Sequence, residues 1–326
     1  MNDSNRGFFA VGGRQWEQVC GMGLNHAVCY LVLARGTGRD NSTTRWSAEA
    51  VFKYTGMAWR RATTVIAEID QTDLIKSVTL KGKRPTRKLV VPADMKDTLW
   101  LPNTLVTGAG REVAPINRLR QTQNLEYLQT FIELYGLQDL AGDGGLPRSL
   151  IRKPYDVREH ICDRGQFKVY GFRSSNNMRY CYTTGVLAKF SGRKSKANDA
   201  WSFIGALENM GLLEMADYLA ESDSPDAELL HALTGDDLAL EVRDAASAAA
   251  AEMPGGFKYE IDNHDYVLPV LKHMESAAVV GISRLVYRPH TSKTAAWYAN
   301  HQNSCRQFLN RYEALAQGDF QQAMCA

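Results

Sequence analysis

The chain has 326 residues, of which 44% are hydrophobic and 23% charged, so it can build sizeable cores and is not predominantly disordered. No stretch approaches the roughly 18 consecutive apolar residues of a membrane-spanning helix, which argues against a membrane protein. The net charge is +2, but the first 196 residues carry +13 and residues 197–265 carry −14. A basic half favours a polyanionic partner such as nucleic acid, although solvated surface charge explains the same count.

The cysteines and the N-terminus bear on location. The six cysteines lie far apart and form no C-x-x-C pair, which argues against a zinc ribbon or a thioredoxin-type site. The first residues show no basic segment followed by an apolar one, the pattern of a secretory signal. We therefore expect reduced thiols and a cytoplasmic protein.

The first 92 residues predict a series of helices that ends in a hairpin. A largely apolar run is followed by a polar, glycine-containing loop at 36–46, and Ser47 is a good N-cap for the next helix. Two short β-type runs flank a basic turn, and a proline follows the second run. The expected elements are helices at 24–33, 47–54 and 58–70 and a hairpin at 74–91.

Beyond residue 92 the patterns predict mostly helices. We expect helices at 124–137, 201–219, 229–252, 267–287 and 297–315, with a second hairpin whose strands are 167–172 and 178–183. The expected fold is mainly α with small β wings, an α+β class. The expected domains are 1–92, a second basic domain at 93–196 that could also be winged, and a mainly helical dimerisation or regulatory region at 197–326.

The order of elements in residues 24–91 resembles the winged helix-turn-helix family of DNA-binding domains. The resemblance covers about a fifth of the chain and rests on the tight turn at 55–57, the third-helix pattern and the wing. It implies that the third helix enters the major groove of double-stranded DNA and reads bases with its N-terminal part. It also implies that the wing contacts the DNA backbone.

The third helix has one apolar face and one polar face. Its apolar residues recur at the spacing of a buried helical face: Ala62, Val65, Ile66 and Ile69. Arginine pairs with guanine, and threonine can contact a thymine methyl or a phosphate, so we expect base contact from Arg60, Arg61, Thr63 and Thr64. Glu68 is expected to read cytosine or to pair with Arg61. A solvated surface helix is the alternative.

Cations around this helix are candidates for phosphate contact. The wing places five of them within eight residues: Lys81, Lys83, Arg84, Arg87 and Lys88. The loop and the helix start add Arg39, Arg45 and Ser47. A basic hairpin that protects a sheet edge, and simple loop solvation, are the alternatives. Three aromatic residues are interpreted as core or scaffold rather than as stacking platforms: Trp46, Tyr54 and Trp59.

Catalytic motifs are missing from the sequence. No phosphate-binding G-x-x-x-x-G-K-[ST], no G-x-S-x-G and no H-E-x-x-H occurs, so we expect no enzyme activity, no metal and no cofactor. The sequence favours a specific double-stranded DNA-binding protein, a transcriptional regulator such as a repressor, acting as a homodimer. The alternatives are a plasmid or phage replication initiator with tandem winged helices and a winged-helix protein-interaction module.

Overall fold

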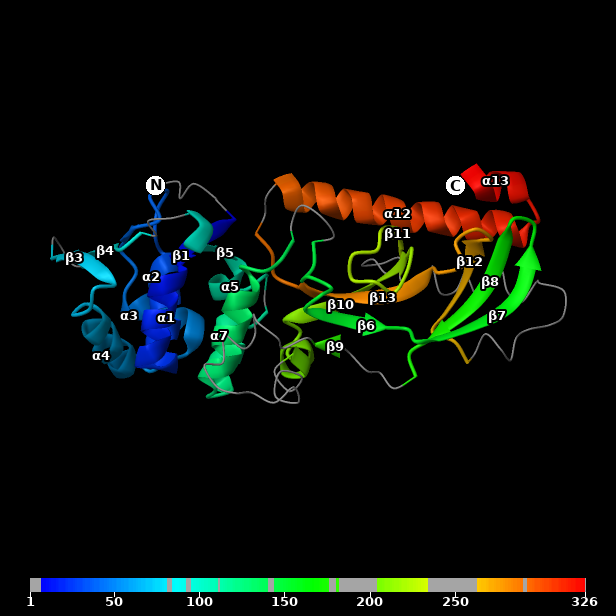
Figure 1. Ribbon diagram of the computed structural model, residues 1–326. Helices are drawn as coiled ribbons and strands as arrows, with labels where there is room; N and C mark the ends of the chain where they lie inside the picture. The colour runs from blue at the N-terminus through cyan, green and yellow to red at the C-terminus, as the bar shows by residue number, and fades with distance from the viewer. Residues whose placement is uncertain are drawn as a thin grey trace. The chain divides into compact units, whose positions relative to one another are not determined.

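The chain folds into two compact units that each use three separate segments. Unit 1 comprises residues 1–138, 184–213 and 285–294, and unit 2 comprises residues 139–183, 214–284 and 295–326. The computed structural model describes residues 7–80, 84–91, 95–110, 112–139, 144–175, 180–181, 204–233, 263–289 and 292–325 (Figure 1). Within these ranges no helix has the length and apolar character needed to cross a membrane. The expected division into three domains stays a prediction.

The expectation of a mainly α fold with small wings is wrong. The described residues contain four sheets, and every strand pairing with a defined register is antiparallel. In unit 1, β1 (Phe8–Gly12) pairs with β5 (Thr98–Pro102), and a second sheet has the order β2 (Thr43–Thr44), β4 (Thr86–Leu89), β3 (Ile75–Thr79). In unit 2, one sheet has the order β11 (Leu229–Ala232), β10 (Leu213–Ala220), β13 (Ala278–Leu285), β6 (Ile151–Pro154), β9 (Tyr180–Cys181). The other has the order β12 (Tyr266–Leu271), β8 (Phe167–Arg173), β7 (Val157–Arg164). The protein is an α+β protein with substantial sheets.

The expected helical C-terminal region contains most of the misread strands. Residues 267–287 form β12 (Tyr266–Leu271) and β13 (Ala278–Leu285) instead of a helix. Residues 204–209 are helical, but β10 (Leu213–Ala220) replaces the rest of the helix expected there. The segment 229–252 begins with β11 (Leu229–Ala232), and its residues 234–252 lie outside the described part. Short apolar runs fit a buried strand as well as a buried helix, which explains these errors.

The second expected hairpin also pairs differently. Strand β8 (Phe167–Arg173) pairs with β7 (Val157–Arg164), and Gly165 turns between them at a φ of 54°. Strand β9 (Tyr180–Cys181) pairs instead with β6 (Ile151–Pro154). The other residues of the expected second strand, 178–179 and 182–183, lie outside the described ranges.

The expected N-terminal elements are confirmed. Helix α1 (Gly13–Met22) precedes α2 (Leu24–Arg35), whose residues 27–34 are all buried. Helices α3 (Ala48–Thr55) and α4 (Trp59–Ile69) follow, and both pack on α2. Gly56 has a φ of 64°, a left-handed conformation that suits glycine, and it ends α3 just before the turn into α4. The hairpin consists of β3 (Ile75–Thr79) and β4 (Thr86–Leu89).

The loop between α2 and α3 completes the wing sheet. Its strand β2 (Thr43–Thr44) pairs with β4, which places Thr43 opposite Lys88. The Asp40 carboxylate holds this loop, because it accepts hydrogen bonds from the backbone and hydroxyl groups of Ser42 and Thr43. Partial burial opposes ionisation, yet these hydrogen bonds lower the pKa of Asp40. The loop is therefore an ordered part of the wing.

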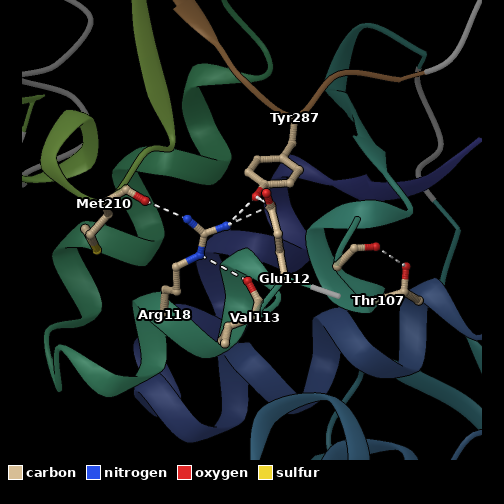
Figure 2. Close-up of polar contacts among 7 residues, drawn as sticks. Thr107, Glu112, Val113, Arg118, Met210 and Tyr287 are labelled. Carbon is tan, nitrogen blue, oxygen red and sulfur yellow. Dashed lines mark hydrogen bonds and ion pairs between the residues drawn. The ribbon is translucent and has the colours of Figure 1, made fainter. Parts of the chain in front are cut away.

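In the rest of unit 1, Arg118 on α6 (Pro115–Gln121) connects separate chain segments by hydrogen bonds. Figure 2 shows its guanidinium between three chain segments: Nε donates to the Val113 carbonyl at 3.1 Å, Nη1 to the Met210 carbonyl at 2.7 Å, and Nη2 to the Tyr287 hydroxyl. That hydroxyl donates in turn to Glu112 Oε2 at 2.8 Å. The elements of this part are η1 (Met95–Asp97), α5 (Thr104–Thr107), α6 (Pro115–Gln121) and α7 (Leu125–Leu134).

Helix α12 (Ser292–Ala316) covers the sheets of unit 2, along which it runs in Figure 1. Its Cys305 packs with Ile282 of β13, and its Ala314 packs with Phe167 of β8. Phe308 lies between them in a cluster with residues of β8, β10, β12 and β13. Helix α13 (Phe320–Cys325) follows and contributes Ala323 to the cluster around Phe167. One helix thus buries apolar side chains from both sheets.

Glu133 on α7 makes the stability of unit 1 depend on pH. Gln129 Nε2 donates to its Oε1 at 3.0 Å, but burial, together with the nearby Glu17 charge, raises the pKa of Glu133 to about 7. In the unfolded chain this carboxyl ionises near pH 4.5. The stability that the protonated Glu133 contributes to the folded state is therefore complete below that pH and is lost as the pH rises through 7. The loss amounts to about 3 kcal/mol at most.

We expect Glu133→Gln to flatten this dependence, since an amide has no charge to bury. Urea unfolding of both proteins between pH 4.5 and 8 measures it, and the variant should be the more stable one at pH 8. The exposed Glu313→Gln on α12 is the control and should keep the wild-type slope. An unchanged slope in Glu133→Gln would show that another group titrates.

Candidate nucleic-acid interface

Helix α4 has the two faces that its sequence predicts. Ala62, Val65, Ile66 and Ile69 are at most 3% exposed and pack inward. The four residues expected to contact bases all have exposed side chains on the other side of the helix: Arg60, Arg61, Thr63 and Thr64. A helix held by its apolar face presents these groups with little freedom of the backbone, as base recognition requires.

Hydrogen bonding limits what the two threonines can offer. Thr63 Oγ1 donates to the Trp59 carbonyl at 3.0 Å, and Thr64 Oγ1 donates to the Arg60 carbonyl at 3.1 Å. Each hydroxyl proton is therefore used within the helix. What remains for a ligand is the hydroxyl oxygen as an acceptor and the methyl group, which suits a thymine methyl better than a phosphate.

Glu68 pairs with a neighbouring helix. Its Oε2 lies 2.6 Å from His26 Nε2 on α2, so the expected pair with Arg61 is replaced by this contact. Glu68 is therefore held against α2, and Arg60 and Arg61 are both exposed.

Arg87 of the wing is an internal anchor. It is 6% exposed, and its Nε and Nη2 donate to the two carboxylate oxygens of Asp70, at the end of α4, at 2.6 and 2.8 Å. The expected phosphate contact by Arg87 does not fit this burial. The period-two alternation of a strand could have predicted the burial of Arg87, because Arg87 lies on the same face of β4 as the buried Leu89.

The other expected phosphate ligands have different surroundings. Lys88, between the two buried residues of β4, is exposed, as are Arg39 and Arg45 in the α2–α3 loop. Arg84 is exposed and pairs with Glu49 at 2.7 Å. Among the described residues, the Ser47 hydroxyl makes no capping bond to α3. Lys81 and Lys83, the expected wing tip, lie outside the described residues. The pairing of β2 with β4 brings the loop and the return strand of the wing together.

The aromatic residues divide into two groups. Trp46 stacks on Tyr54 with ring centroids 5.1 Å apart, and Arg35 lies over the Trp46 ring at 5.4 Å, which agrees with a scaffold role. Trp59, at the start of α4, was interpreted as core or scaffold; it is 53% exposed and therefore not part of the core. It lines a groove of about 410 Å³ between α3, α4 and the wing. Sequence reasoning missed this groove because three separate elements build it.

Within the described part of the chain, no three histidine, cysteine, aspartate or glutamate residues come close enough to hold a metal ion. The candidate interface presents exposed cations, threonines and one exposed indole. No protein-family model matches this sequence, and comparisons with curated proteins and with solved structures gave no match either.

Proposed function

We propose that this protein binds double-stranded DNA with α4 in the major groove. The observation that carries the proposal is the row of exposed side chains on α4, Arg60, Arg61 and Thr64, opposite a face that is almost completely buried. Arginine donates two hydrogen bonds to guanine, and threonine presents a methyl group and an acceptor, so the row can distinguish bases. A specific regulator of transcription is the role that such a surface supports best.

The cations beside α4 supply affinity without sequence preference. Lys88 on the wing and Arg39 and Arg45 in the loop are exposed and lie on elements joined by the pairing of β2 with β4. Each phosphate that such a cation neutralises releases counterions, so binding weakens as salt rises. This division of roles predicts that added salt weakens the affinity for specific and for non-specific DNA alike, whereas α4 determines which sequence is bound.

Arg60→Ala tests the base-reading role. We expect it to weaken binding to the preferred site by about 1–3 kcal/mol, which is about 5- to 150-fold, and to relax the sequence preference at one position. The preferred site is obtained by selection from a random duplex pool at two salt concentrations. Titration of labelled duplexes, selected and scrambled, then measures both effects.

The matched control is Arg306→Ala, an exposed arginine on α12 of unit 2. It should leave both affinity and sequence preference unchanged. If Arg60→Ala kept the wild-type preference, α4 would not be the reading helix. If no duplex bound at either salt concentration, the DNA proposal would fail, and a protein partner for the winged surface would take its place.

The homodimer remains part of the proposal. Two copies of α4 would read two half-sites about one helical turn apart, and the selected sequence would then be a palindrome. A selected site without that symmetry, together with a monomer in sedimentation, would remove the dimer and leave DNA binding intact.

A further inference from the structure

The groove beside α4 has the size of a ligand site. Its volume of about 410 Å³ falls in the range of about 300–1,000 Å³ that is usual for small-molecule sites. Trp59, Thr63 and Ala67 line one wall at four-residue spacing along α4, and Glu49 of α3 and Arg84 of the wing line the others. The groove therefore combines an aromatic ring with charged and polar groups.

Trp59 is the most unusual member of this wall. Its exposed fraction of 53% is large for an aromatic side chain, which usually buries most of its surface. Nucleobases stack on such rings, and stacking does not depend on the base because every base has a π-face. An indole that lines a groove can receive one base, provided that the base is not stacked in a duplex.

Arg84 is the charged group of the groove that suits the phosphate of the same nucleotide. Arg84 and Glu49 are 64% and 57% exposed, and their contact of 2.7 Å is the kind of surface ion pair that contributes little stability. A phosphate can therefore displace the Glu49 carboxylate from Arg84, and the exposed Glu49 side chain then turns into solvent, away from the like charge. Arg87, at the base of the groove, stays paired with Asp70 and keeps the wing in place.

We propose that this groove binds one unpaired nucleotide of a DNA strand, with the base on Trp59 and the phosphate beside Arg84. The inference rests on the proposed function, because the row formed by Arg60 and Thr64 adjoins the groove wall along α4. It adds a second substrate class to that function, since a protein that holds duplex and unpaired nucleotides side by side stabilises a locally opened or distorted site.

The test uses the full chain and three probes: a fluorescently labelled single strand of eight deoxythymidines, free thymidine monophosphate, and the duplex selected above. We expect Trp59→Ala to weaken binding of the single strand by about 5- to 150-fold. Trp59→Phe keeps an aromatic ring and should restore most of that binding. Duplex affinity should change less than the single-strand affinity.

Phe52→Ala is the matched control. Phe52 is 54% exposed on α3 and is not among the described residues that line the groove, so its removal should change neither affinity. Equal single-strand binding by wild type and Trp59→Ala, with normal duplex binding, overturns this inference alone. Tighter binding of free thymidine monophosphate than of the strand also overturns it and assigns the groove to a free nucleotide. If neither duplex nor strand binds, both proposals fail.

Discussion

Asp70→Ala is expected to lower the free energy of unfolding by about 3–5 kcal/mol, because it leaves a buried guanidinium without its counter-charge. The side chains of Arg87 and Asp70 are only 8% and 19% exposed, and two nitrogens of the guanidinium each donate a short hydrogen bond to a different carboxylate oxygen. Such a two-point pair is stronger than a surface ion pair, and its loss exposes the full cost of burying Arg87. The wing loses its attachment to α4 at the same time.

Urea unfolding measures the change. Asp73→Ala, an exposed aspartate three residues further on, is the control and should stay within about 0.5 kcal/mol of wild type. The double variant Asp70→Ala with Arg87→Met removes both charges and should recover much of the loss. A loss below about 1 kcal/mol in the single variant would mean that Arg87 reaches water when Asp70 is absent.

Phe308→Ala is the second substitution with a large expected effect, a loss of about 3–5 kcal/mol from unit 2. The ring is fully buried and belongs to a core cluster with eight other buried residues: Tyr155, Phe172, Leu219, Leu233, Leu268, Val270, Ala277 and Val279. These residues come from both sheets of the unit. The cavity left by alanine is therefore lined by both sheets, and the movement of one strand cannot fill it.

Hydrogen exchange is the sharpest measurement of this effect. Amides of β12 and β13 should exchange faster in Phe308→Ala, in proportion to the lost stability. Gln307→Ala changes the exposed neighbour on the same helix and should leave those amides as protected as in wild type. Unchanged protection of β12 and β13 in Phe308→Ala would show that α12 contributes little to holding the sheets.

The N-terminal elements could be predicted because their signals are local. Gly56 ends α3, Ser47 precedes it, and the apolar spacing of α4 is that of a helix, so each boundary depends on a few neighbouring residues. The strands of unit 2 depend on distant partners. The strand at 167–172 was predicted, but its partner was not: Phe167 of β8 pairs with Leu271 of β12, more than 100 residues away, and the apolar run of β12 does not alternate clearly enough to mark a strand.

The candidate site shows the same distinction between local and distant information. The exposure of Arg60, Arg61 and Thr64 follows from helical spacing alone and was predicted. Whether Trp59 packs inward depends on how closely α3 and the wing approach the first turn of α4, and no pattern within α4 contains that information. The ion pair of Arg87 with Asp70 joins a strand to a helix end, which only the assembled wing sheet defines.

The interleaving of the two units has a consequence for biosynthesis. The chain passes from one unit to the other after residues 138, 183, 213, 284 and 294. A ribosome adds about 5–20 residues per second, so the first helices of unit 1 emerge many seconds before Tyr287, whose hydroxyl and carbonyl contact Arg118 and Tyr135. Unit 1 therefore cannot be completed before nearly the whole polypeptide is made, and a nascent chain that stalls in between exposes an unfinished core to chaperones and proteases.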